Sequence, residues 1–190
     1  SEGIWSNKGN CLEPGKYAIL EKDAVKTDMT IDLEATPAGT DIALIVDTSG
    51  SMSDDISVLK NNISTVTSNI RSYIPDSRFG LVSLGTLGYS PYLPIQNITD
   101  DLTTFNSKVA TIPSGSGSYE YHTVTIEQTA SGSGTTQTVK TYDGGSDYSV
   151  NVSSASCGSG FRGGICFREN SLPLFVLMSD EAFATSGWIW

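Results

Sequence analysis

Oxygen-bearing side chains cluster directly after a short apolar run. The run DIALIV occupies residues 41–46, and the loop after it carries Asp47, Ser49 and Ser51 at alternate positions, with Gly50 between the serines. Glycine gives the loop backbone freedom, so that it can curl and direct the alternate side chains toward one centre. A carboxylate with two hydroxyls suits a hard divalent cation, Mg²⁺ above all. The loop therefore predicts a cation site with positions left open for water or for a partner's oxygen.

A second acid follows another apolar run, much later in the chain. LPLFVLMSD reads as a strand that ends in Asp180. Continuous apolar runs separated by helices favour a parallel sheet that is covered on both faces. Ligands of such sheets bind beyond the carboxyl ends of the strands. If the two strands are neighbours, Asp47 and Asp180 converge at one edge of the sheet.

Three helices are expected to pack against this sheet. The first covers residues 54–74 after a cap at Ser53 and presents an apolar stripe with helical spacing. The stripe consists of Ile56, Leu59, Ile63, Val66, Ile70 and Ile74. A second helix, from Asp101, repeats the pattern at Leu102, Phe105, Val109 and Ile112. Residues 119–130 fit either a helix or a strand, and we favour the helix.

Further strands are predicted over residues 78–85 and 92–99, and Pro94 marks the latter as an edge strand because proline cannot donate to a ladder. The pattern predicts an α/β fold: a Rossmann-like doubly wound, mainly parallel sheet flanked by helices. A short β-rich lead-in over residues 1–40 precedes the main domain, residues 41–190. An insertion loop at about residues 131–171 suggests a hairpin that turns at residues 143–145.

The cysteines give one candidate disulfide. Cys157 and Cys166 flank a glycine-rich loop that is flexible enough to let them meet, and two reduced thiols are the alternative. Cys11 has no evident partner in the chain.

The loop and the later acid together resemble the metal-ion-dependent adhesion site of the von Willebrand factor A (vWA) family. That family has a strand followed by Asp-x-Ser-x-Ser, which residues 47–51 match, and an acid after a later strand, here Asp180. The likeness spans about residues 41–182 and is closest to integrin β-subunit I-like domains and bacterial secreted vWA proteins. It implies that Asp47, Ser49, Ser51 and Asp180 bind Mg²⁺ or Mn²⁺.

The integrin-like version implies further ligands. Its loop continues with Met-x-Asp-Asp, as in residues 52–55, and there the paired acids hold a second cation, usually Ca²⁺. Asp54 and Asp55 would take this role, although acids also suit the first turn of a helix. A glutamate from an intervening loop completes the adhesion site of that version, a role that falls here on Glu120, whose alternative is a solvated surface acid.

The likeness also implies that the chain is incomplete. A full vWA domain continues after the second acid with a helix, a strand and a terminal helix, whereas ten residues follow Asp180 here. We therefore expect a vWA fold that lacks its C-terminal part.

Net charge and composition limit the classes of partner and the locations to be expected. The net charge of −10 disfavours nucleic acid, and there is no run of 18 apolar residues that would insert into a membrane. Abundant Ser and Thr with little Lys is common in secreted and cell-surface proteins, so we expect a secreted, extracellular or cell-surface location.

Three functions remain to be compared. In the first, adhesion, an Asp or Glu of a partner protein completes the coordination of the cation. In the second, the domain is a structural scaffold, assembled into a surface filament or matrix, in which the metal serves folding. An enzyme is the third and is not expected, because Asp47-Thr48-Ser49 differs from the Asp-x-Asp of aspartyl phosphatases and His122, the only histidine, accompanies no nucleophile-elbow motif.

Overall fold

The computed structural model describes residues 39–84, 92–113, 122–139 and 148–180. Residues 1–38 of the predicted β-rich lead-in, with Cys11 among them, and the turn at residues 143–145 lie outside the described residues. The elements in chain order are β1 (Thr40–Asp47), α1 (Ser53–Tyr73), β2 (Ser77–Leu84), β3 (Leu93–Thr99), α2 (Leu102–Ala110), α3 (His122–Ser131), β4 (Thr135–Val139), β5 (Tyr148–Val152), β6 (Phe161–Arg162), β7 (Phe167–Arg168) and β8 (Leu172–Met178).

The central sheet is mostly parallel. Its four strands lie in the order β3-β2-β1-β8, with β1 parallel to both β2 and β8, and β3 antiparallel to β2. The prediction of an edge strand containing Pro94 is confirmed. Val46 pairs with Met178 and Asp47 pairs with Leu84, so the carboxyl ends of three strands meet at one edge. The fold is therefore mixed α/β with a mainly parallel sheet, as the sequence predicted.

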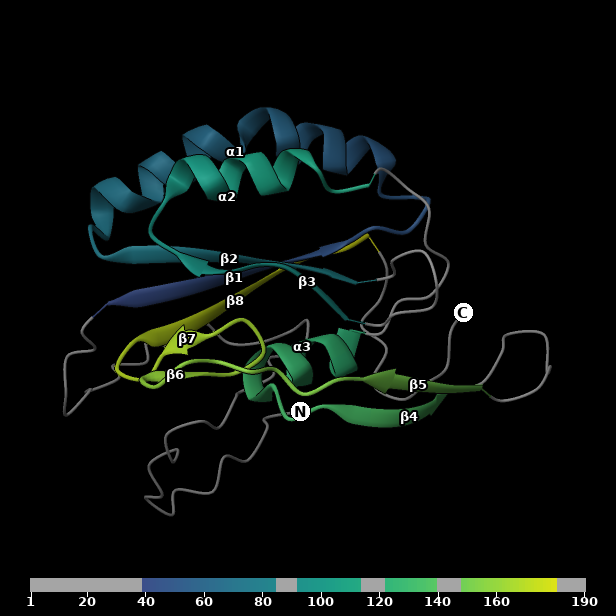
Figure 1. The fold of residues 1–190 in the computed structure, drawn as a ribbon. Helices are drawn as coiled ribbons and strands as arrows, with labels where there is room; N and C mark the ends of the chain where they lie inside the picture. The colour runs from purple at the N-terminus through teal and green to yellow at the C-terminus, as the bar shows by residue number, and fades with distance from the viewer. Residues whose placement is uncertain (1–38, 85–91, 114–121, 140–147, 181–190) are drawn as a thin grey trace, which may run out of the picture. The chain divides into compact units, whose positions relative to one another are not determined.

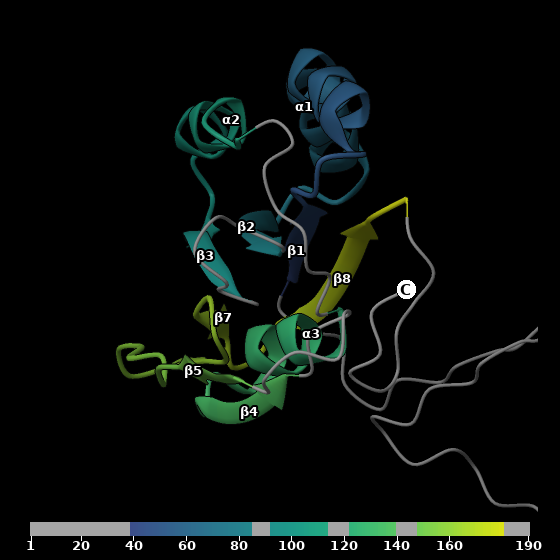
Figure 2. The same ribbon diagram turned by 90° about the vertical axis from the view of Figure 1, so that its right-hand side faces the viewer.

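Helices flank both faces of the sheet (Figure 1). Helices α1 and α2 cover one face, and α3 lies on the other with the small strand pairs β4–β5 and β6–β7 (Figure 2). Alternate strand residues supply two apolar cores. The first core includes Ile42, Leu44, Val46, Phe79, Leu81 and Phe105, and the second includes Ala43, Ile45, Val82, Leu84, Ile165 and Phe167.

The predicted stripe of α1 is partly wrong. Ile56 and Ile63 are buried, and Leu59 and Ile70 pack against the first core, but Val66 is 45% exposed and Ile74 is 36% exposed. Thr67 is buried in place of Val66. Its hydroxyl donates to the carbonyl of Ile63 at 2.9 Å, which satisfies the polar group inside the helix. No described helix is both long and apolar enough to cross a membrane.

Strand β8 is more exposed than its continuous apolar sequence predicted. Leu172, Leu174 and Val176 are 39%, 40% and 48% exposed, and they share one face of the strand. Within the described residues β8 is an edge strand that pairs with β1 alone. The helices of the described residues therefore leave this stripe partly uncovered.

The insertion packs against the C-terminal end of α3. Cys157 and Cys166 form a disulfide, with Cα atoms 5.4 Å apart, that closes the loop containing β6. Gly163 has a φ of +76°, and an added Cβ there would lie 2.8 Å from the carbonyl oxygen of Ala130. Glycine at this position thus combines a left-handed backbone with a close approach to the helix.

A buried ion pair fixes the insertion to the start of β1. Asp41 is fully buried and accepts hydrogen bonds from the backbone N–H of Arg168 at 2.7 Å and from its Nε at 2.8 Å. The Ser171 hydroxyl donates to the same carboxylate, and Arg168 also pairs with Asp76 at 2.8 Å. Burial alone would lower the pKa of Arg168, but the hydrogen bonds and charges of the two aspartates outweigh burial and raise it. The charge of Asp41 is therefore compensated.

Asp101 caps α2, and its removal is expected to destabilise this helix. Its carboxylate accepts from the Thr104 hydroxyl at 2.6 Å and from the backbone N–H groups of Thr104 and Thr103 at 3.2 and 2.9 Å. These bonds, led by that from the Thr104 hydroxyl, lower the pKa of Asp101 below its ordinary value of 3.8. The resulting stabilisation is fully present above pH 3.8 and is lost as pH falls through the lower pKa of the folded state.

Thermal unfolding of Asp101→Ala and Asp101→Ser should reveal this cap. Asp101→Ala should have a lower Tm at about pH 7, and its difference from wild type should shrink toward about pH 2 as the wild-type carboxylate is protonated. Asp101→Ser keeps a capping oxygen that does not titrate, so its difference from Asp101→Ala should persist. A pH-independent difference between wild type and Asp101→Ala would contradict the role of the charge.

Candidate metal site at the carboxyl ends of β1 and β8

Asp47 is the innermost residue of the predicted site. It ends β1 and is fully buried. Its Oδ1 accepts a hydrogen bond from the backbone N–H of Ser49 at 2.8 Å, and its Oδ2 accepts one from the hydroxyl of Ser179, also at 2.8 Å. Each carboxylate oxygen thus has one partner within the protein and retains a further lone pair. Both oxygens can therefore still bind a water or a cation.

The charge of Asp47 lacks a basic partner among the described residues. No lysine or arginine in those ranges forms an ion pair with it, whereas Asp41, at the other end of the same strand, is paired with Arg168. Burying a carboxylate against neutral donors alone is costly, because a buried charge needs an opposite charge or a metal ion. A bound cation would offset this cost, so the charge balance fits the predicted site.

The two loop serines lie together beside this carboxylate. The hydroxyl oxygens of Ser49 and Ser51 are 3.2 Å apart. Ser49 is 3% exposed, while Ser51 and Gly50 are exposed. The donor set is thus one buried carboxylate and two hydroxyls that lead outward to solvent. Hard oxygen donors of this kind suit Mg²⁺, which retains waters in its shell.

Thr48 and Met52 hold the loop in place, and sequence reasoning gave neither a role. The Thr48 hydroxyl donates to the carbonyl of Leu84 at 2.8 Å and lies 3.1 Å from the hydroxyl of Ser83. Met52 is 1% exposed and packs into the first core. The only sequence signal was that a threonine lies between Asp47 and Ser49 and that an apolar residue follows Ser51.

Ser179, and not the predicted Asp180, makes the contact between the ends of β8 and β1. The two strands are neighbours, as the prediction required. Asp180 is exposed and has no hydrogen bond or ion pair with Asp47, Ser49 or Ser51. Ser179 is the first residue after β8, and it is the side chain that reaches Asp47. The role of Asp180 as a ligand, directly or through water, stays a prediction.

His122 extends this network and was not predicted to belong to it. It is the first residue of α3, is 1% exposed, and its Nε2 lies 2.9 Å from the Ser179 hydroxyl oxygen. Because the Ser179 hydroxyl donates to Asp47, we assign the hydrogen of the second bond to His122 Nε2. The order is His122 to Ser179 to Asp47, which connects three elements at one edge of the sheet.

The structure does not show the remaining predicted ligands beside Asp47. Asp54 and Asp55 are exposed in the first turn of α1, where they suit the helix dipole. The predicted cap at Ser53 is wrong, because Met52 is the capping position and its side chain makes no capping hydrogen bond. Glu120 lies outside the described residues. Among the residues that are described, no group of three or more His, Cys, Asp or Glu side chains gathers, and the site depends on hydroxyls.

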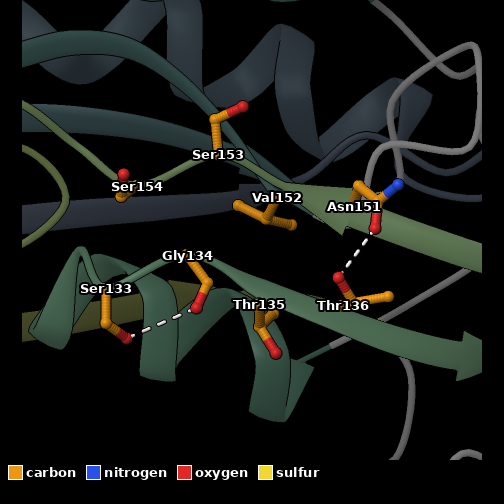
Figure 3. A pocket seen from close by; sticks show the side chains of 8 residues that line it. All are labelled: Ser133, Gly134, Thr135, Thr136, Asn151, Val152, Ser153 and Ser154. Atoms are coloured by element: carbon orange, nitrogen blue, oxygen red, sulfur yellow. Dashed lines mark hydrogen bonds between the residues drawn. The ribbon is translucent and has the colours of Figure 1, made fainter.

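A pocket elsewhere in the insertion has no part in this site. It lies between the start of β4 and the end of β5, and Figure 3 shows the Thr136 hydroxyl bonded to the Asn151 side chain at its rim. The lining consists of Ser133, Gly134, Thr135, Thr136, Asn151, Val152, Ser153 and Ser154. None of these side chains is charged at neutral pH, so the lining offers no acid–base group.

Comparisons with known proteins leave the site to be interpreted from its own geometry: no model of a known protein family matches the chain, and no curated protein matches its sequence.

Proposed function

We propose that this chain is an adhesion domain that captures an acidic residue of a partner protein through a divalent cation held at the end of β1. The observation that carries the proposal is Asp47, a fully buried carboxylate that neutral donors alone contact among the described residues. The Ser49 and Ser51 hydroxyls beside it complete a hard oxygen donor set. Mg²⁺ or Mn²⁺ is the proposed ion, and the proposed location is extracellular or at the cell surface.

The assignment of the α/β fold as vWA-like is part of the same proposal. A vWA-like arrangement places its ion beyond the carboxyl ends of central parallel strands, and Asp47 follows β1 between its parallel neighbours β2 and β8. In this reading Asp47, Ser49 and Ser51 hold the ion, and Asp180 acts through water. Glu120, which lies outside the described residues, is the proposed further ligand.

The outward side of the site supports capture of a ligand. Ser51, Gly50 and Asp180 are exposed, so a carboxylate of a partner can approach the ion from solvent. The net charge of −10 repels acidic partners at long range. Salt screens that repulsion beyond about 8 Å at physiological ionic strength, while the ion attracts the carboxylate at contact. Moderate salt should therefore not weaken the interaction.

The proposal is tested by isothermal titration calorimetry with Mg²⁺ and Mn²⁺, followed by capture of acidic peptides. Wild type should bind either ion and then retain glutamate-containing peptides from a random library more strongly than the same peptides with glutamine. Chelation with EDTA should release them, and Asp47→Ala should neither bind the ion nor retain the peptides. Retention that persists in EDTA or in Asp47→Ala would show that the adhesion proposal is wrong.

A structural scaffold is the second candidate, and the complete burial of Asp47 favours it. An ion bound there would neutralise a charge inside the fold, as a metal that serves folding does. The two candidates differ in how much saturating Mg²⁺ raises the Tm. An ion enclosed by protein ligands should raise it greatly, whereas an open site of millimolar affinity should raise it by only a few degrees.

The order of the hydrogen bonds from His122 to Ser179 to Asp47 disfavours a hydrolase. In a Ser-His-Asp hydrolase the histidine lies between the serine and the aspartate, so that it can take the serine's proton. Here Ser179 lies between His122 and Asp47 and donates its proton to the carboxylate. A screen of esterase and phosphatase substrates should therefore detect no turnover.

A further inference from the structure

We propose that Ser179 and His122 are positioning residues that hold the Asp47 carboxylate in one orientation and thereby make the site prefer Mg²⁺ to Ca²⁺. This inference rests on the cation site proposed above and assigns its ion preference to two residues that were not expected to contribute to it.

The first step is that both oxygens of Asp47 are held. The backbone N–H of Ser49 donates to Oδ1 and the Ser179 hydroxyl donates to Oδ2, each at 2.8 Å. One hydrogen bond alone would let the carboxylate rotate about its Cβ–Cγ bond. The second, from Ser179 just after β8 and 132 residues away in sequence, prevents this rotation. Only one remaining direction on each oxygen is then open to a ligand.

The second step is that His122 fixes the donor. A serine hydroxyl rotates among staggered positions, so Ser179 alone would direct its hydrogen toward Asp47 only part of the time. His122 Nε2 donates to the Ser179 oxygen at 2.9 Å, and it is almost fully buried at the start of α3. A donor on the Ser179 oxygen favours the orientation in which its own hydrogen points at Asp47. The two side chains thus act as a pair.

The third step connects orientation to the identity of the ion. Mg²⁺ demands nearly ideal octahedral geometry with oxygen ligands at about 2.1 Å, whereas Ca²⁺ accepts six to eight oxygens in flexible geometry and often takes both oxygens of one carboxylate. A carboxylate with a protein donor on each oxygen is held in one orientation and cannot rotate to adapt to the ion. A fixed orientation suits the nearly ideal octahedral shell of Mg²⁺, whereas Ca²⁺ gains less from it because its geometry is flexible.

Calorimetric titration of Mg²⁺ and of Ca²⁺ into matched variants tests whether Ser179 and His122 set the preference for Mg²⁺. Ser179→Ala should weaken Mg²⁺ binding about 10- to 100-fold, the usual effect of removing a group that orients a metal ligand. Ca²⁺ binding should weaken by less than about 3-fold, because that ion adapts to a carboxylate free to rotate. Ser179→Thr keeps the hydroxyl and should retain the wild-type preference. Ser107→Ala, on the exposed face of α2, is the control for loss of a hydroxyl elsewhere.

Two histidine variants give an independent measurement if Ser179→Ala does not fold. The amide nitrogen of glutamine reaches the position of Nε2, whereas that of asparagine reaches the position of Nδ1. His122→Gln should therefore keep the preference for Mg²⁺, and His122→Asn should lose it.

The outcomes separate this inference from the function on which it depends. If wild type binds neither ion, the cation site itself is wrong. If wild type binds Mg²⁺ while Ser179→Ala or His122→Asn keeps the wild-type ratio of Mg²⁺ to Ca²⁺ affinity, the pair does not set the preference. An equal loss for both ions, with a lower Tm in the absence of metal, would mean that the pair only supports the fold. A loss selective for Mg²⁺ supports the proposal.

Discussion

Asp47→Asn is expected to abolish cation binding while leaving the metal-free protein at least as stable as wild type. The substitution keeps the shape of the side chain but removes a buried charge that no basic residue compensates among the described residues. Cation affinity should fall by more than about 100-fold, the upper limit for loss of a group that merely orients a ligand. Calorimetry measures the affinity, and urea unfolding in EDTA measures the stability.

Asp41→Asn is the matched control, because the same change is made at the opposite end of the same strand. Asp41 is also fully buried, but its charge is paired with Arg168. Its substitution should lower the free energy of unfolding by about 1–3 kcal/mol, because the guanidinium loses a charged partner. Cation affinity should not change. If Asp47→Asn and Asp41→Asn destabilise the metal-free protein equally, the charge of Asp47 has a compensating partner and the principal argument for the site is lost.

Arg168→Met is expected to cause the largest loss of stability of any single change considered, about 3–5 kcal/mol. It leaves Asp41 buried with only the Ser171 hydroxyl and the backbone N–H of residue 168 as donors. It also frees Asp76, whose bond to Arg168 contributes to attaching the insertion to the sheet. Chemical unfolding followed by two spectroscopic probes gives the free energy and shows whether the transition stays cooperative.

Arg78→Met provides the comparison for this prediction. Arg78 pairs with Asp100 at 3.7 Å, and the side chain of Asp100 is 72% exposed. Exposed pairs of this kind contribute between about 0 and 1 kcal/mol. A loss for Arg168→Met no greater than that for Arg78→Met would show that Asp41 does not depend on its arginine.

Local sequence patterns predicted most of the individual elements. Apolar residues at helical spacing located α1 and α2, and Pro94 identified the edge strand β3. These features follow from short-range geometry, because the helical period and the missing N–H of proline act within a few residues. The stripe of α1 was misplaced by one residue where Thr67 is buried instead of Val66, since a threonine that bonds its own helix backbone is not visible as apolar.

The loop after β1 is the part of the site that the sequence by itself determined. Asp47, Ser49 and Ser51 lie within five consecutive residues, so their proximity is set by local chain geometry, and the bonds from the Ser49 backbone to Asp47 and between the two serines span only two residues. The tertiary structure alone decided which distant groups complete it. Ser179 and His122 are brought to Asp47 by the pairing of β8 with β1 and the packing of α3, and Arg168 reaches Asp41 across 127 residues. Such contacts depend on strand order and register, which no local pattern in the chain encodes.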